Sequence, residues 1–476
     1  MTRYAIAGTL AACLLVGLGT GGGSAFGTEG ADVPTYHRDV APILQRHCQD
    51  CHRPGEVAPF SLLEYDHARR RASDLLLVVE ERRMPPWPAS KDFGGPFRDE
   101  RILSDAEIDT LQRWLDADTP EGDPADAPEP LTFAGDWPMG EPDLILTMAE
   151  PYALGAEGDD EFRVFVLPTD LPEDRWIRAV DFKPGNRRVV HHVIAGTDTS
   201  GRARELDAED ETPGYSAVGG FGDGVPIRSF LPIWVPGSTP RDAPEDAGYL
   251  LPKGADVLIQ VHYHKSGKVE EDATAIGLYF SDEPLGREVR TGFVFPDVSM
   301  FQAMKARAAM QEKGGRPGLN EFMREVLVIP PGEANYEVKG STRQGGVMGR
   351  PLGRDVLLTA VMPHMHWLGK DFTLTAVLPD ETRVPIIRID RWDFNWQGTY
   401  ALLEPVFLPE GTWFEMVAHF DNSAENPNNP SHPPVLVRWG DQTNDEMCIG
   451  IFEFVPATDA DRARSVSRDP SGDAAD

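Results

Sequence analysis

Half of the histidines of this chain lie in tight clusters between residues 191 and 366. Six of the twelve lie in three clusters: His191-His192, His262 with His264, and His364 with His366. Histidines at i and i+2 of a strand point to the same face, so His364 and His366 can bind one metal ion together. Adjacent histidines point to opposite faces of a regular strand, so His191 and His192 can share an ion only if the backbone bends there.

The ligand types indicate which metal such clusters would hold. Imidazoles without a cluster of thiolates or carboxylates suit copper, zinc or nickel, and a thioether beside two imidazoles favours Cu(I). Met447 could supply that thioether. The alternative is that the histidines are hydrogen-bonded core residues and that Met447 is ordinary packing. The residues alone therefore indicate a metal site, with copper favoured and zinc or nickel left open.

A second reactive group lies near the N-terminus. Cys48, Cys51 and His52 form a C-x-x-C-H motif. In this motif two thiols form thioethers with a haem, and the adjacent imidazole ligates the iron from one face. A zinc site is disfavoured because no second cysteine pair lies nearby. We therefore expect one covalently bound haem c.

The sixth iron ligand must reach the opposite face of the haem, so it must come from a residue well downstream. Met84 is favoured because the two prolines after it would hold a ligand loop rigid. His67 is the competing ligand, and core packing is the alternative role of Met84. A methionine ligand raises the reduction potential relative to two histidines, which predicts an electron relay rather than an oxygen binder.

Composition and the first residues restrict location and partners. A short basic start, an apolar run and small residues predict a secretory signal peptide over residues 1–27, and hence a periplasmic or secreted protein. Cys13 lies inside the apolar run, unusually early for a lipidated cysteine. No later stretch has the roughly 20 apolar residues of a membrane helix. The net charge of -32 would repel a phosphate backbone, so nucleic acid is a poor partner.

Periodicity predicts the elements that position these residues. Residues 33–118 read as a small all-α domain, of the kind a cytochrome c requires, and its last helix opens with a capping box at Ser104 and Glu107. The Pro-rich and acidic residues 119–142 predict a linker. Short apolar runs between Pro, Gly and Asp turns then predict β-sandwich or barrel domains, with a helix expected at Met300–Lys313. The polar residues 458–476 are expected to form a disordered acidic tail.

Several motifs between residues 180 and 450 occur in an order and at separations typical of one family. They are Asp181-Phe182-Lys183-Pro184 with Val190-His191-His192, Gln260-Val261-His262-Tyr263, Ile329-Pro330-Pro331-Gly332-Glu333, His364-x-His366-x-Leu368-Gly369, and Asp445-Glu446-Met447-Cys448. Together they resemble the copper type II, ascorbate-dependent monooxygenases, which include the peptidylglycine- and dopamine β-hydroxylating enzymes. The resemblance implies two successive jelly-roll-like β-sandwich copper domains, over residues 143–288 and 289–457.

The resemblance also implies two copper ions per chain. An electron-transfer copper would be bound by His191, His192 and His262, and the copper that activates oxygen by His364, His366 and Met447. In that family a solvent-filled cleft separates the two coppers. A substrate C–H bond is hydroxylated, with one atom of O2 entering the product and the other leaving as water.

The chain also departs from the peptide-amidating members of the family. These hold the substrate carboxylate with an Arg and a Tyr, whose places are taken here by Met362 and Ile451. Peptidylglycine is therefore a poor substrate, and Met362, Ile449 and Ile451 suggest an apolar pocket. His264 matches no family ligand and is expected on the surface. Cys448 is expected to be a buried free thiol.

Three functions remain open from the sequence. The favoured one is a secreted copper-dependent monooxygenase acting on a small organic substrate. Its fused haem would relay electrons from an external donor, which could be a redox protein, a quinol-linked chain or ascorbate. The alternative is a non-catalytic haem and copper protein that carries electrons or binds copper. A third reading is a haem-copper reductase of a small inorganic substrate.

Overall fold

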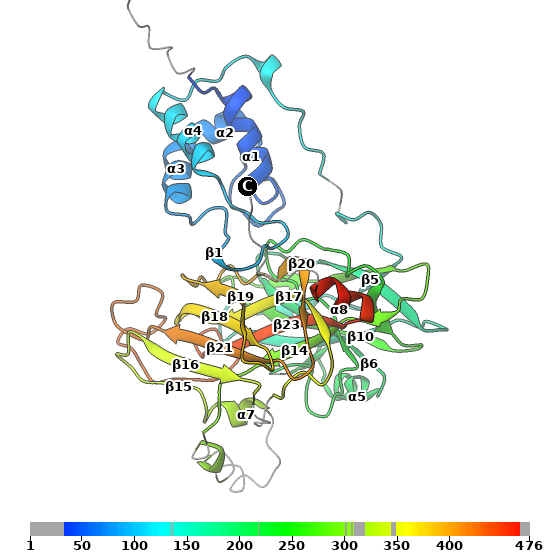
Figure 1. Ribbon diagram of the computed structural model, residues 1–476. Coiled ribbons are helices and arrows are strands. Elements are labelled where there is room, and N and C mark those ends of the chain that lie inside the picture. The colour runs from blue at the N-terminus through cyan, green and yellow to red at the C-terminus, as the bar shows by residue number, and fades with distance from the viewer. Residues whose placement is uncertain are drawn as a thin grey trace, which may run out of the picture.

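The computed structural model describes residues 33–133, 135, 137–217, 219–299, 302–305, 308, 319–343 and 349–466. The chain is mostly β-sheet with few helices, as the sequence predicts (Figure 1). The predicted signal peptide with Cys13, most of the predicted helix at Met300–Lys313, and residues 467–476 lie outside the described residues. Within the described ranges no helix has both the length and the apolar character needed to cross a membrane.

The N-terminal helices pack on one another. They are η1 (Tyr36–Val40), α1 (Ala41–His47), α2 (Tyr65–Arg70), α3 (Ala72–Glu80) and α4 (Asp105–Asp116). Their apolar sides share a core that includes Leu44, Leu111 and Trp114. The predicted capping box is confirmed, because the Ser104 hydroxyl accepts from the Glu107 amide at 3.2 Å and the Glu107 carboxylate accepts from the Ser104 amide at 2.8 Å. The predicted linker holds one 3-10 turn, η2 (Pro124–Asp126).

One strand interrupts the interval that the sequence predicts to be all helical. Between α3 and α4, β1 (Ala89–Gly94) pairs with β19 (Arg383–Ile389) at the edge of a sheet built from the C-terminal half of the chain. Gly94 has a φ of +76°, and a side chain there would collide with the carbonyl of Ile386. The contact is continued by Phe97, whose ring lies 5.5 Å from that of Tyr400. Residues 89–97 therefore pack against strands of two sheets from the C-terminal half of the chain.

The first β unit consists of two five-stranded sheets, with orders β7-β4-β10-β6-β8 and β13-β9-β5-β12-β2. Residues from both sheets, such as Ile259 of β10 and Ile276 of β12, share one apolar core. Helix α5 (Arg202–Glu209) follows β6, and β11 pairs with β3 apart from the two sheets. The strands are β2 (Leu144–Thr147), β3 (Tyr152–Leu154), β4 (Glu161–Pro168), β5 (Arg175–Lys183), β6 (Val190–Asp198), β7 (Tyr215–Ser216), β8 (Ser229–Phe230), β9 (Ala247–Leu251), β10 (Asp256–Tyr263), β11 (Glu270–Asp272), β12 (Ala275–Phe280) and β13 (Arg287–Glu288).

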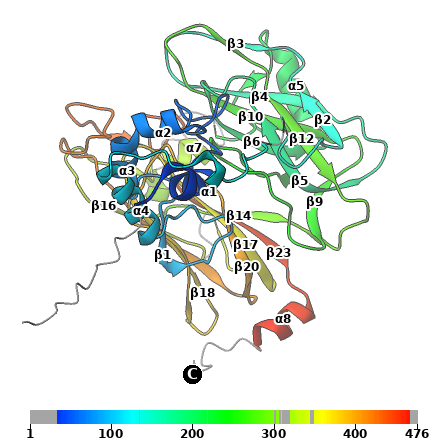
Figure 2. The ribbon, with the colours of Figure 1, turned by 90° about the horizontal axis from the view of Figure 1, so that it is seen from above.

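The second β unit has the sheets β1-β19-β18-β21-β16 and β14-β23-β17-β20 around a second core, with β15 and β22 paired separately. Helix α7 (Leu319–Met323) precedes β15. The remaining strands are β14 (Arg290–Val294), β15 (Val328–Ile329), β16 (Tyr336–Ser341), β17 (Val356–Met365), β18 (Gly369–Val377), β20 (Tyr400–Leu408), β21 (Trp413–Phe420), β22 (Val437–Arg438) and β23 (Cys448–Pro456). Figures 1 and 2 show the N-terminal helices on one side of the two β units.

The beginning of the predicted disordered tail is ordered. Helix α8 covers Asp459–Val466. The Asp461 carboxylate is buried, accepts a hydrogen bond from the Thr458 amide at 2.8 Å and pairs with Arg287 at 3.0 Å. This local cap and the ion pair to β13 explain why a segment so polar folds back onto the chain.

Candidate metal centres

The backbone bend that His191 and His192 require is present as a β-bulge. In the pairing of β6 with β10, His192 lies opposite His262, and the next pair joins Val190 to Tyr263, so His191 is the extra residue. The His192 Nδ1 atom lies 3.3 Å from Nδ1 of His191 and 3.4 Å from Nδ1 of His262. The three imidazoles thus converge on one point and could hold a single ion.

These three imidazoles are neutral at ordinary pH. Burial lowers the pKa of His191 to about 3, and the pKa values of His192 and His262 also lie below the usual range, mainly through burial. The His262 Nε2 atom lies 3.1 Å from the Asp160 carboxylate, so Nε2 carries the proton and Nδ1 presents a lone pair to the other rings. Three neutral nitrogen donors, with a carboxylate behind one of them, fit a bound transition metal.

Asp160 joins this first cluster to the second β unit. Besides His262, its carboxylate accepts from Nδ1 of the exposed His264 at 2.9 Å and from the hydroxyl of Thr443. Its amide donates to the side chain of Gln442 at 3.0 Å. Burial opposes ionisation of Asp160, but the hydrogen bonds outweigh it and hold its pKa well below the usual range. His264 is therefore a surface residue, as expected, which shares the carboxylate with His262.

The second cluster lies at the end of β17. The rings of His364 and His366 are 5.2 Å apart. Nδ1 of His364 lies 2.5 Å from Oε1 of Gln397, and Nδ1 of His366 lies 3.1 Å from the carbonyl oxygen of Asp445. Each Nδ1 therefore donates, which leaves both Nε2 atoms as acceptors for a metal. Burial lowers the pKa of His364 to about 4 and holds that of His366 well below its usual range, so both are neutral.

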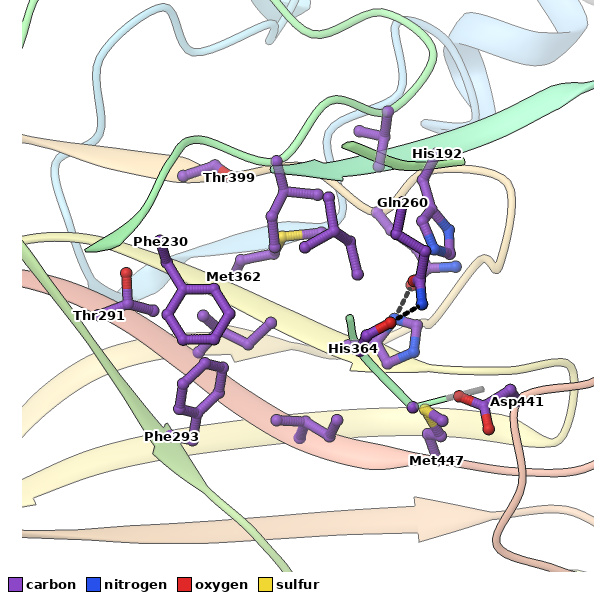
Figure 3. A pocket seen from close by; sticks show the side chains of 18 of the residues that line it. His192, Phe230, Gln260, Thr291, Phe293, Met362, His364, Thr399, Asp441 and Met447 are labelled. Atoms are coloured by element: carbon purple, nitrogen blue, oxygen red, sulfur yellow. Dashed lines mark hydrogen bonds between the residues drawn. The ribbon is translucent and has the colours of Figure 1, made fainter. Parts of the chain in front are cut away.

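Glu446 ties Met447 to this second cluster. Its side chain is fully buried and accepts from the amides of His366 at 2.9 Å, Leu368 at 2.7 Å and Met447 at 3.0 Å. Burial raises its pKa to about 8. Since one carboxyl group holds the start of β23 against the end of β17, the Met447 thioether faces the same cavity as His364 and His366 (Figure 3). Next to it, Cys448 is a buried free thiol, as expected.

An aromatic ring lies between the two clusters. The Phe394 ring stacks on His191 with centroids 4.9 Å apart, and it meets the His366 ring edge-on at 5.7 Å. The solvent-filled cleft that the family resemblance implies is thus partly filled by a buried side chain. No sequence motif indicated Phe394, Asp160 or Gln397, which lie in irregular segments outside the strands.

A cavity of about 360 Å³ opens between the two β units beside both clusters. His192 borders it from the first cluster, and His364, His366 and Met447 border it from the second. Its remaining walls are mostly aliphatic and aromatic, and the described lining residues include no lysine or arginine. The apolar pocket expected from the sequence is therefore present, and it lies next to the metal-ligand set.

The C-x-x-C-H segment forms a single turn. The amides of Cys51 and His52 both donate to the carbonyl of Cys48, at 3.2 and 2.9 Å. Both thiols are free, and burial raises the pKa of Cys48 to about 12. The His52 Nδ1 atom lies 3.2 Å from the Phe60 carbonyl oxygen, which leaves Nε2 available. Two unpaired thiols beside an oriented imidazole fit covalent haem attachment.

The two proposed sixth ligands both lie in this helical segment. Met84 follows α3 and is partly buried, with its amide donating to the Val78 carbonyl at 3.1 Å. His67 lies on α2, and its Nδ1 atom is buried with no hydrogen-bond partner among the described residues. A buried polar atom without a partner needs an explanation, so His67 stays open beside Met84 as the second axial ligand.

The segment that follows His52 contacts the first β unit. Glu56 pairs with Arg187 at 2.9 Å and with Arg53 at 3.0 Å. Arg187 lies four residues before His191, in the connection between β5 and β6. An ion pair thus joins the segment after the C-x-x-C-H motif to the connection that leads into β6.

Comparisons with known proteins do not show to which family the chain belongs. No family model and no curated protein matches it. Among solved structures it is similar to T=1 particles derived from infectious bursal virus, with 9% identity over 68% of this chain and 72% of that one and a TM-score of 0.17. It is also similar to a variant of the oxalate decarboxylase of Bacillus subtilis (10% identity, 78% and 87% covered, TM-score 0.12) and to the recombinant pro-11S globulin of pumpkin (8%, 65% and 84%, 0.13). At such TM-scores these likenesses decide nothing about fold or function.

Proposed function

We propose that this chain is a copper-dependent monooxygenase that hydroxylates an aliphatic C–H bond of a small organic molecule with O2. The observation that carries the proposal is the arrangement of two buried or half-buried sets of neutral imidazoles beside one mostly apolar cavity. In this proposal the chain is a relative of the copper type II, ascorbate-dependent monooxygenases. Residues 33–118 form a cytochrome c domain, and residues 143–288 and 289–457 form two jelly-roll-like copper domains.

The two clusters have different tasks in this proposal. His191, His192 and His262 hold an electron-transfer copper through their Nδ1 atoms. His364 and His366 hold the second copper through Nε2, with the Met447 thioether as third ligand. Copper, when bound, supplies one-electron redox chemistry and the activation of O2, and the thioether favours Cu(I).

The neighbouring residues orient these ligands. Asp160 fixes the proton of His262 on Nε2, and Gln397 and the Asp445 carbonyl do the same at Nδ1 of His364 and His366. The mostly apolar walls of the cavity favour a hydrocarbon group over water beside the second centre.

Cys48, Cys51 and His52 would hold a haem c, whose one-electron chemistry would connect the enzyme to an external donor. The Glu56–Arg187 pair supports this route, because it joins the haem-binding segment to the connection that leads into β6. The predicted signal peptide agrees with a periplasmic or secreted enzyme, where redox proteins, a quinol-linked chain or ascorbate can act as donor.

Metal analysis and isotope labelling test the proposal. The purified full chain is expected to hold two copper ions and one haem, and to transfer one atom of oxygen-18 gas into an organic product found by untargeted mass spectrometry. Met447→Ala should abolish product formation with a modest loss of copper, whereas Met304→Ala, at an exposed methionine, should change neither. A protein with both coppers and no labelled product under any donor would be the non-catalytic alternative.

The haem route has its own experiment. Rapid mixing of the reduced, copper-loaded chain with O2 and substrate should oxidise the haem during turnover. Glu56→Gln should slow this oxidation without changing the haem spectrum, whereas Arg70→Gln, which removes an exposed pair with Asp66 on α2, should not. If the haem stays reduced while product forms, the haem is not the electron source, and the copper-dependent monooxygenase is unaffected by that result.

A further inference from the structure

We infer that the substrate is an uncharged, mainly hydrocarbon molecule that lies along strands β17 and β23, with its reacting end at His364 and Met447. The inference rests on the proposed function, because it names the class of molecule that the cavity would accept. Three observations support it: the register of β17 with β23, the aromatic rings at one end of the cavity, and the charges of the residues that line the cavity.

The floor of the cavity is formed by residues that lie next to the proposed metal ligands along β17 and β23. In the pairing of β17 with β23, His364 lies opposite Ile449 and Met362 lies opposite Ile451. Alternate residues of a strand share one face, so Met362 follows His364 into the cavity just as Ile449 and Ile451 follow Met447. All of these side chains line the cavity. An apolar strip therefore leads away from the ligands along the strand direction.

The strip is long enough for an extended chain. Strand β17 contributes to the lining as far as Ala360, four residues before His364, which is a length of roughly 13 Å at about 3.3 Å per residue. Strand β14 widens the floor, since Phe293 pairs with Ile451. A linear or singly branched molecule could thus keep one carbon at the ligands and bury the rest along the strip.

Aromatic rings form the end of the cavity away from the ligands. Phe230 of β8 comes from the first β unit and meets Phe293 of β14 edge-on, with ring centroids 5.4 Å apart. Figure 3 shows both rings on the side of the cavity opposite His192 and His364. The far end of the substrate therefore meets hydrocarbon rather than a polar anchor.

The charged groups at the lining have partners within the protein. Glu453 pairs with Arg241 at 2.6 Å, and the Asp441 carboxylate accepts from the Asn320 amide at 2.5 Å. With no lysine or arginine among the described lining residues, a substrate carboxylate would be desolvated without a counter-charge. An ammonium group would have to share Glu453 with Arg241 or Asp441 with Asn320, and it would lose its own hydration. Both costs favour a neutral molecule.

Binding of straight-chain compounds that differ in length and charge tests both properties that we infer for the substrate. We would titrate the copper-loaded, reduced full chain under nitrogen with 1-butanol, 1-hexanol and 1-octanol, and compare octanoate and octylammonium by calorimetry. Affinity should rise by about fourfold per methylene, the value for a fully buried CH2. Both ions should bind at least about tenfold more weakly than 1-octanol. Affinity independent of length, or equal or tighter binding of either ion, would overturn the inference.

Two variants locate the binding site. Phe293→Ala should lower the affinity for 1-octanol and leave the affinity for 1-butanol unchanged, because only the longer chain reaches the aromatic end. Ile451→Arg should reverse the preference between octanoate and 1-octanol, and Val269→Arg, at an exposed valine outside the lining, should leave it unchanged. If Phe293→Ala keeps its native circular dichroism but loses affinity for 1-octanol and 1-butanol to the same degree, the placement along the strip is contradicted.

The test separates this inference from the proposed function. Binding is measured without O2, so it does not depend on turnover. Alcohols that bind as expected but never acquire oxygen-18 would contradict the monooxygenase and leave the ligand class standing. Incorporation of oxygen-18 only into charged compounds that bind tightly would support the monooxygenase and overturn the ligand class.

Discussion

The Phe394 ring lies nearly parallel to the His191 imidazole, at an interplanar angle of 17° and a centroid distance of 4.9 Å. The same ring also meets His366 of the second cluster, so one buried side chain touches a proposed ligand of each copper. Such a ring limits the rotation of both imidazoles and keeps water from the space between them. The two proposed centres are therefore coupled by packing.

Removal of this ring should uncouple the centres. We expect Phe394→Leu to retain two coppers but to slow electron transfer between them by about tenfold, the lower range for groups that orient metal ligands. Rapid-freeze electron paramagnetic resonance during a single turnover measures that rate. Phe394→Tyr keeps the ring and should behave as the parent chain. An unchanged rate in Phe394→Leu would show that the ring has no part in the transfer.

Asp160→Asn should weaken copper binding at the first cluster. The substitution removes the negative charge behind His262, and loss of such a carboxylate typically costs about 10–100-fold in metal affinity. Competition with a Cu(I) chelator measures the affinity. His264→Ala removes the exposed partner of the same carboxylate and should leave affinity within about twofold, since the bond to His262 persists. Equal losses in the two variants would contradict this role of Asp160.

The haem ligand can be assigned by paired substitutions. If Met84 is the sixth ligand, Met84→Ala should lower the haem reduction potential and admit added imidazole, because a thioether raises the potential relative to nitrogen ligands. His67→Ala should then leave both properties unchanged. The reverse result would assign His67, whose buried Nδ1 has no hydrogen-bond partner among the described residues. Redox titration followed by haem absorbance measures both variants.

Asp181 should destabilise the chain at neutral pH. Its Oδ1 accepts from the Phe182 amide at 2.7 Å, its buried Oδ2 has no partner in the described chain, and burial raises its pKa to about 6. A folded pKa above the unfolded value of about 3.9 means that stability falls as pH rises from about 4 to about 6 and is not regained above that.

Asp181→Asn should therefore raise the unfolding temperature at pH 7.5, by an amount that corresponds to about 1–2 kcal/mol after allowance for partial exposure. At pH 4 the same substitution should have little effect. Thermal unfolding at the two pH values measures this, with Asp92→Asn, at an exposed aspartate of β1, as the matched control. A stabilisation of equal size at both pH values would exclude the titration of Asp181 as its cause.

Local signals in the sequence predicted the local structure well. The capping box of Ser104 and Glu107 and the same-face pair of His364 and His366 depend on residues a few positions apart. The need for a bend at His191 was also readable, since adjacent strand residues diverge, and the bulge in β6 supplies it. The metals, the haem and the substrate remain predictions.

The sequence did not predict the contacts between segments that are far apart in the chain. The polar sequence of β1 has no apolar alternation to indicate a strand, and its partner β19 lies almost 300 residues away. Asp160 and Phe394 lie in irregular connections between strands. The packing of the two β units decides where these connections run, and hence which histidines the two residues contact. A propensity for strand or turn carries no information about such contacts.

The strand β1 has a consequence for how this chain could be divided. It lies between two helices of the N-terminal segment but forms the edge of a sheet whose other strands come from residues 336–420. A truncation after the last N-terminal helix would strip that sheet of its border and leave β19 open to aggregation. No boundary after α4 therefore separates two independent parts, and we expect the N-terminal helices and the β units to fold well only when they are expressed together.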